Sequence, residues 1–125
     1  MFKKFFSLKE ANRRLPYIKK IVGEILANGK ELKSLAPRAN EEQIALQCQT
    51  LTDEINGRMK ELEDLGCFFK DWNFEVGLVD FPAKIDGQDV LLCWRSDEGE
   101  ILWYHGIEDG YTGRRPLPVE WLIGE

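Results

Sequence analysis

The sequence predicts an α+β fold in which a long antiparallel helical hairpin packs on an antiparallel β-meander of three to four strands. In residues 1–66, apolar side chains recur every three or four positions, the period of an amphipathic helix. Residues 67–125 hold ten of the fourteen aromatic residues, in short apolar runs separated by Asp, Asn and Gly, as in strands and turns. Strands that follow helices indicate the α+β class. We expect residues 1–125 to form one domain, ending in a C-terminal loop.

The first predicted helix begins at Ser7. Residues 7–10 read Ser-Leu-Lys-Glu, a capping box in which the serine hydroxyl accepts the amide of Glu10 and the glutamate reaches back. Pro16 lacks an amide donor and crowds the preceding turn, so we expect a kink or a short separate helix there. The apolar stripe of this segment consists of Leu15, Ile18, Ile21, Val22, Ile25, Leu26 and Leu32.

The second predicted helix follows Asn40, a good N-cap with Glu41 and Glu42 in the first turn, and stops at Gly66. Its apolar positions step by alternate fours and threes, with Arg58 as the exception, which is a heptad seam. A helix of about 25 residues is ~37 Å long, more than a core this small needs. We therefore expect a homodimer through the helices. The seam is formed by Ile44, Cys48, Leu51, Ile55, Leu62 and Leu65.

Four strands are predicted, near residues 67–71, 77–85, 88–95 and 100–105. Asp86-Gly87 is a strong hairpin signal, because a type I′ turn needs positive φ at both central residues. The predicted register pairs Asp80 with Cys93. Residues 97–99, Asp-Glu-Gly, suit a three-residue loop, which would place Cys93 opposite Trp103.

Strict alternation along these strands separates two faces of the sheet. The face toward the helices is expected to carry Val79, Phe81, Ala83, Val90, Leu92, Trp94, Leu102 and Tyr104. The outer face mixes apolar bodies with titratable groups, which a purely solvated surface would not normally assemble. We therefore expect a ligand or partner there. That face is expected to carry Leu78, Asp80, Pro82, Cys93, Arg95, Ile101, Trp103 and His105.

The predicted binding site combines this outer face with the loop of residues 106–115. Asp80 and Arg95 are diagonal across the strand pair, so either a structural ion pair or a ligand contact by Arg95 is compatible with the sequence. With Trp103 as an aromatic floor, the site would suit an anionic or planar small molecule, or an acidic side chain of a partner. The candidate ligand-binding residues are Asp80, Arg95, Trp103, His105, Glu108, Asp109, Arg114 and Arg115.

The alternative is a small-molecule or metal-dependent enzyme that uses His105 with nearby carboxylates and arginines. The spacing of His105, Glu108 and Asp109 matches no zinc signature, and no nucleophile motif accompanies them. We therefore predict a binding or assembly module without a metal or cofactor, and interpret Cys93 as a buried thiol. No catalytic residue is assigned.

Charge and cysteine content narrow the class further. Residues 1–66 carry a net charge of +2 and residues 67–125 one of −7, and the acidic half opposes binding to nucleic acid. No apolar window is long enough to span a membrane. Three cysteines at unequal spacing form no disulfide framework, so we expect a reduced protein of the cytoplasm.

Several segments carry a likeness to a known family: FSLKEANRRLPYIKKI, DLGCFFKD, GLVDFP, DGQDVLLCWR and WYHGIEDGYTGRRPL. The chain resembles the prokaryotic family of unknown function DUF2203 over nearly its full length, most specifically in residues 77–117. The resemblance implies a small bacterial or archaeal cytosolic protein. It carries no catalytic residues with it, so function has to be argued from the site.

Overall fold

The computed structural model describes residues 2–71 and 73–124, and it confirms the α+β class. The described strands form one antiparallel sheet of five strands in the order β1-β2-β3-β4-β5, slightly more than the three to four expected. The elements are α1 (Leu8–Leu35), η1 (Ala36–Arg38), α2 (Glu42–Asp64), β1 (Phe68–Phe69), β2 (Leu78–Ile85), β3 (Gln88–Arg95), β4 (Trp103–Gly106), η2 (Tyr111–Gly113), β5 (Arg115–Pro116) and α3 (Val119–Gly124).

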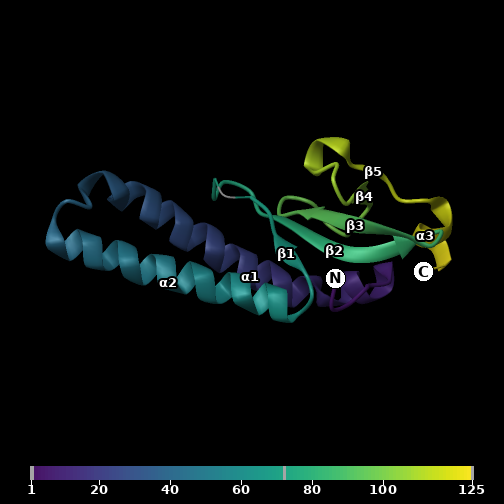
Figure 1. Ribbon diagram of the computed structural model, residues 1–125, viewed down its shortest axis with the longest axis horizontal. Coiled ribbons are helices and arrows are strands. Elements are labelled where there is room, and N and C mark those ends of the chain that lie inside the picture. The colour runs from purple at the N-terminus through teal and green to yellow at the C-terminus, as the bar shows by residue number, and fades with distance from the viewer. Residues whose placement is uncertain (1, 72, 125) are drawn as a thin grey trace.

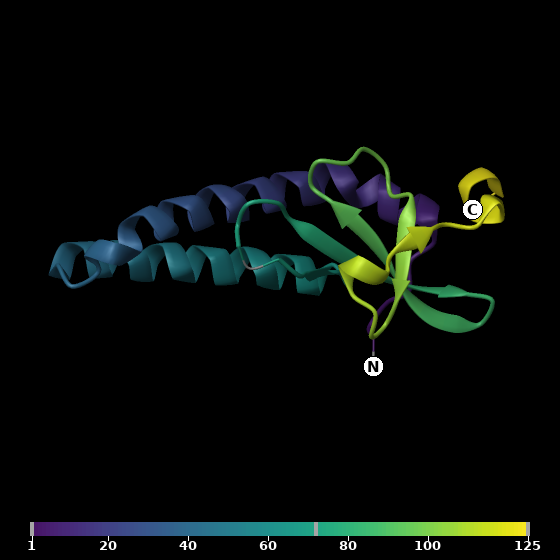
Figure 2. The same ribbon diagram turned by 90° about the horizontal axis from the view of Figure 1, so that it is seen from above.

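The helices form a long antiparallel hairpin, and the sheet covers only its base (Figure 1). The start of α1 and the end of α2 lie beside the sheet, while the turn around η1 projects far beyond it in both views (Figures 1 and 2). One hydrophobic core joins the two parts, because buried side chains of α1, α2 and the inner face of the sheet belong to the same cluster. Among the described residues, no helix combines the length and the hydropathy needed to span a membrane.

The capping box at the start of α1 is confirmed. Ser7 Oγ accepts the amide of Glu10 at 3.1 Å, and the Glu10 carboxylate accepts the amide of Ser7 at 3.2 Å. The short separate helix that was one of the two expectations at Pro16 is not formed, since α1 runs unbroken through that residue. A proline inside a helix costs about 3 kcal/mol, and the burial of an apolar stripe that includes Leu15 and Ile18 outweighs that local cost.

The predicted N-cap of α2 is displaced by one residue. Glu41, with an extended backbone and no side-chain cap, holds the N-cap position in place of Asn40. The turn that begins in η1 continues to Glu41, whose amide donates to the Arg38 carbonyl at 3.0 Å and whose carboxylate pairs with the Arg38 guanidinium. Asn40 therefore lies within this turn and does not cap α2.

Gly66 ends α2 as expected. Its φ of +98° lies in the left-handed region, its amide donates to the Glu63 carbonyl at 2.9 Å, and the amide of Cys67 donates to the Leu62 carbonyl at 3.1 Å. These two bonds make a Schellman motif. The chain is thereby turned toward the sheet.

The predicted register of the sheet is confirmed. Asp80 pairs with Cys93, and Cys93 with Trp103. The turn between β2 and β3 has positive φ at both Asp86 and Gly87, as a type I′ turn requires. Two short elements at the C-terminal end, β5 and α3, were not expected, because two residues of strand and six of helix carry too little periodicity.

The predicted faces hold except in the loop before β4. Ile101, expected on the outer face, is 1% exposed and belongs to the core, whereas Leu102, expected in the core, is 50% exposed. The chain leaves strand geometry there because the amide of Ile101 donates to Asn12 Oδ1 on α1 at 2.8 Å. Alternation resumes at Trp103, so His105 stays on the outer face.

Candidate functional site: a pocket on the outer face of the sheet

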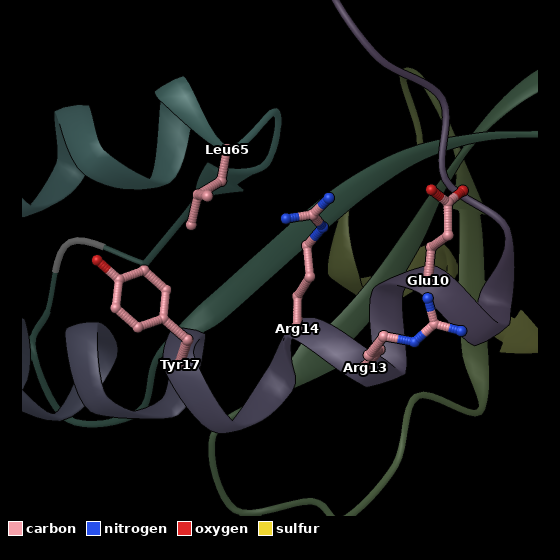
Figure 3. A pocket seen from close by; sticks show the side chains of 5 residues that line it. All are labelled: Glu10, Arg13, Arg14, Tyr17 and Leu65. Carbon is pink, nitrogen blue, oxygen red and sulfur yellow. The ribbon is translucent and has the colours of Figure 1, made fainter.

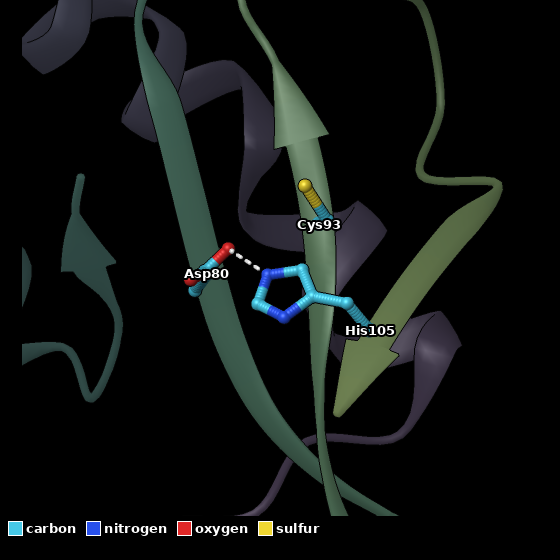
Figure 4. Close-up of side chains that lie close together, drawn as sticks. All are labelled: Asp80, Cys93 and His105. Atoms are coloured by element: carbon cyan, nitrogen blue, oxygen red, sulfur yellow. Dashed lines mark hydrogen bonds and ion pairs between the residues drawn. The ribbon is translucent and has the colours of Figure 1, made fainter. Parts of the chain in front are cut away.

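Three polar side chains meet on the outer face at the centre of the sheet (Figure 4). Asp80 lies on β2, Cys93 lies opposite it on β3, and His105 lies on β4. The imidazole of His105 reaches across β3 to Asp80, with Nε2 and Oδ1 3.2 Å apart. All three residues are at most 3% exposed. We call them the Asp80–Cys93–His105 cluster.

The second nitrogen of the imidazole determines its tautomer. His105 Nδ1 lies 2.8 Å from the carbonyl oxygen of Gly106, and a carbonyl only accepts hydrogen bonds, so Nδ1 carries a proton. The hydrogen bond to Asp80 raises the pKa of His105 to about 10; Cys93 and the Gly106 carbonyl act in the same direction, while burial opposes them. At neutral pH the imidazole is therefore protonated and faces the buried carboxylate as an ion pair.

The cluster lines a pocket of about 300 Å³, the outer-face pocket. Leu78, Leu91 and Ile107 supply apolar lining, and Lys70 and Tyr111 supply further polar groups. This combination of an apolar lining with a few convergent polar groups is typical of small-molecule sites.

Arg95 does not pair with Asp80, contrary to one expectation. Its guanidinium donates to both carboxylate oxygens of Asp97, at 2.8 and 2.7 Å, and to the hydroxyl of Tyr111 at 2.8 Å. Asp97 is only two residues along the chain, whereas Asp80 is buried against His105. The bonds to Asp97 and Tyr111 raise the pKa of Arg95, and they place Tyr111 at the pocket.

Arg114 separates Trp103 from the pocket. Its Nη2 donates to both oxygens of Glu98, at 3.0 and 2.8 Å, and the guanidinium lies 4.8 Å from the ring centroids of Trp103 and Tyr111. Trp103 is thus covered by an arginine and does not line the pocket whose floor it was expected to form. Tyr111 is the aromatic residue that does.

The remaining candidates lie outside the outer-face pocket. Glu108 is exposed, and Asp109 accepts the amide of Gly106 at 3.2 Å and lies 4.0 Å from Arg115. Arg115 is exposed and lies over the ring of Tyr104. Neither loop carboxylate reaches His105, because the backbone of Gly106 holds Asp109 beside the loop itself.

Sequence reasoning found Asp80 and His105 but missed Lys70, Tyr111 and the part played by Cys93. For Cys93 the signal was present, since the register placed it opposite Asp80 on the same face as His105. Lys70 follows a strand of two residues, too short for its alternation to be read. Tyr111 lies in a loop, where no periodicity applies.

A second pocket, of about 340 Å³, lies at the base of the hairpin (Figure 3). Glu10, Arg13, Arg14, Tyr17 and Leu65 line it. None of these residues is buried, and two of the polar groups already have partners: Glu10 accepts from Lys4, and the Tyr17 hydroxyl donates to Glu61. The outer-face pocket is therefore the stronger candidate.

Among residues 2–71 and 73–124, one group of metal-ligating side chains is close enough for a single ion to contact three donors. It is the Asp80–Cys93–His105 cluster, whose donor atoms lie within 4.8 Å of one another.

The structure is that of an α+β protein with a pocket of about 300 Å³ on the outer face of its sheet. The chain belongs to the family described as "Uncharacterized conserved protein (DUF2203)", whose sequence profile matches residues 4–117 and so includes every strand and every residue of the outer-face pocket. The comparison with curated proteins found no match, and neither did the comparison with solved structures.

Proposed function

We propose that this protein is a small-ligand-binding module and that the outer-face pocket is its binding site. The observation that carries the proposal is the buried Asp80–His105 pair lining a pocket of about 300 Å³. Burial of charged groups is costly, and it is found where a specific interaction requires it or where a binding site is built. The volume lies at the lower end of the usual range for ligand pockets, about 300–1,000 Å³, so the ligand is small.

The charge around the pocket favours a ligand with a carboxylate and an apolar body. Arg95 and Arg114 are already paired with Asp97 and Glu98, so they offer little to an incoming anion. Lys70 lines the pocket, has no carboxylate partner among the described residues, and holds its ammonium group 5.7 Å from the ring centroid of Phe68. In this proposal Lys70, and not an arginine, contacts the carboxylate of the ligand.

Benzoate and benzamide are matched probes for this proposal, since they differ in charge but hardly in shape. We expect benzoate to perturb the amide resonances of Leu91, His105 and Ile107 in a ¹H–¹⁵N spectrum. Ile107→Trp should fill the pocket and abolish binding of both probes. Lys70→Met should weaken benzoate about two- to fivefold, the value of an exposed ion pair, and leave benzamide unchanged.

Leu102→Trp is the control, because Leu102 is exposed and does not line the pocket. Perturbations that are unchanged in Ile107→Trp, or that map to the base of the hairpin, would contradict the proposal. As part of the same proposal we place the protein in the cytoplasm, which its three unpaired cysteines support.

A further inference from the structure

We propose that Asp80, Cys93 and His105 bind one transition-metal ion of the zinc class at the bottom of the outer-face pocket. The inference deepens the proposed function and rests on it, since the ion would reach the cluster through that pocket and would anchor the small ligand there.

The distances suit a single ion. His105 Nε2 and Asp80 Oδ1 are 3.2 Å apart, and the three donor atoms all lie within 4.8 Å of one another. Zinc–ligand bonds of 2.0–2.3 Å in a tetrahedron separate the ligand atoms by about 3.3–3.6 Å. Each donor comes from a different strand of one hydrogen-bonded sheet, so the backbone already holds the three side chains together.

The tautomer of His105 suits a metal ligand. Nδ1 donates its proton to the Gly106 carbonyl, which leaves Nε2 directed at Asp80. A lone pair on Nε2 facing a carboxylate needs positive charge between them, supplied either by a proton or by a metal ion. Histidines that bind metals commonly donate their other ring N–H to a carbonyl or carboxylate in this way.

The same hydrogen bonds argue against a cysteine nucleophile. In a nucleophile–His–Asp triad, the carboxylate and the nucleophile contact opposite nitrogens of the imidazole. Here a backbone carbonyl occupies Nδ1, and the Asp80 carboxylate lies at Nε2, the nitrogen that would have to take the proton of a thiol. The arrangement is that of convergent ligands.

The donor set and its charge select the kind of ion. A thiolate and an imidazole favour zinc and similar ions over Mg²⁺ and Ca²⁺, which prefer oxygen ligands. The Asp80 carboxylate and a Cys93 thiolate would neutralise a divalent ion in this buried position. Three protein ligands leave a further coordination position, which the outer-face pocket makes accessible to a small carboxylate.

Cobalt titration of the full chain, freed of metal with a chelator, tests the inference. We expect one equivalent of Co²⁺ to bind and to produce the near-ultraviolet charge-transfer band of a thiolate–Co²⁺ bond. Cys93→Ala should remove the band and weaken Co²⁺ binding at least about tenfold. Loss of a residue that only orients a metal ligand typically costs about 10- to 100-fold in metal affinity, and loss of a ligand itself should cost no less. Cys48→Ala, in α2, is the matched control and should change neither. A titration without a saturable site, or a band that persists in Cys93→Ala, would overturn the inference.

A second measurement needs no variant. X-ray absorption of the zinc-loaded wild type should show one sulfur together with nitrogen and oxygen ligands, and a shell without sulfur would overturn the assignment of Cys93. Benzoate binding, measured with and without bound metal, separates the two proposals. If benzoate binds but no Co²⁺ site is found, only the metal site is overturned. If benzoate binds neither the metal-free nor the metal-loaded protein, while the Co²⁺ band is normal, only the proposal of a small carboxylate ligand is overturned.

Discussion

The Asp80–His105 pair is buried, whereas a second ion pair between two strands of the sheet, Lys84–Asp89, is partly exposed. In the partly exposed pair, solvent can hydrate either charge when the other is removed. In the buried pair, whose residues are at most 3% exposed, removal of the carboxylate leaves the imidazole without its partner and with little contact to solvent. The two pairs therefore make a matched comparison of what burial contributes.

Asp80→Asn should lower the free energy of unfolding of the metal-free protein by about 3–5 kcal/mol, the cost of breaking a buried pair by removing one partner. Asp89→Asn, in the partly exposed pair, should cost less than about 1 kcal/mol. Urea unfolding followed by circular dichroism measures both. Equal losses would mean that the Asp80 carboxylate is hydrated in the folded protein.

Cys48 and Cys67 should differ in reactivity. Burial raises the pKa of Cys67 to about 12, and its thiol donates to the Leu62 carbonyl at 3.4 Å, whereas Cys48 is partly exposed on α2. The thiolate is the reactive species. Iodoacetamide at mildly alkaline pH should therefore modify Cys48 in the folded protein and leave Cys67 intact, as mass spectrometry of the peptides would show. Denatured protein, in which all three cysteines should react, is the control, and rapid native labelling of Cys67 would contradict the prediction.

At the scale of the elements, a glycine within α2 and a glycine just after its C-cap differ in backbone conformation. Gly57 lies in the middle of α2 and is exposed to solvent, and an added Cβ would meet nothing within 4 Å. Gly66 has a φ of +98°, and an added Cβ would meet side chains of Lys4 and Phe6 at 3.2 and 3.3 Å. The same substitution should therefore act in opposite directions at the two positions.

Gly57→Ala should raise the free energy of unfolding by up to about 1 kcal/mol, because alanine is the better helix former. Gly66→Ala should lower it by about 1–3 kcal/mol, because a side chain is forced into the left-handed region at the Schellman turn. Chemical unfolding of the two variants beside the wild type gives both values. A stabilising Gly66→Ala would show that the end of α2 can rearrange without cost.

At the scale of the whole molecule, the hairpin extends well beyond the sheet (Figure 1). Leu51 and Ile55 of the predicted heptad seam are buried within a single chain. That part of the seam is therefore not available to a second copy. Leu46 is 64% exposed beside a groove of about 400 Å³ on the projecting part, which Asn28 and Thr50 also line. We propose that a second copy of the chain covers this surface.

Light scattering should accordingly find a dimer in the wild type. Leu46→Glu should give a monomer with unchanged helix content, since the side chain lies outside the core of one chain. Leu122→Glu, at an exposed position on α3, is the control and should remain dimeric. A wild type that is monomeric at high micromolar concentration would remove the dimer.

Local signals determined much of this protein in advance. The capping box at Ser7, the stop at Gly66 and the turn at Asp86-Gly87 depend on hydrogen bonds and backbone angles within a few residues, so they can be read from the sequence. Together with alternation, the turns placed Asp80, Cys93 and His105 on one face of the sheet.

Tertiary structure decided what those residues contact. Pro16 stays within a continuous helix because core packing outweighs a local cost, and Ile101 turns inward because Asn12, far away in the sequence, binds its amide. Arg95 pairs with Asp97 and Arg114 pairs with Glu98. Asp80 therefore pairs with His105. A charged side chain often has several possible partners within reach, and small differences in distance and burial determine which one it pairs with. A pattern of spacing therefore identifies the face that carries the site, and only the folded chain determines which groups meet on it.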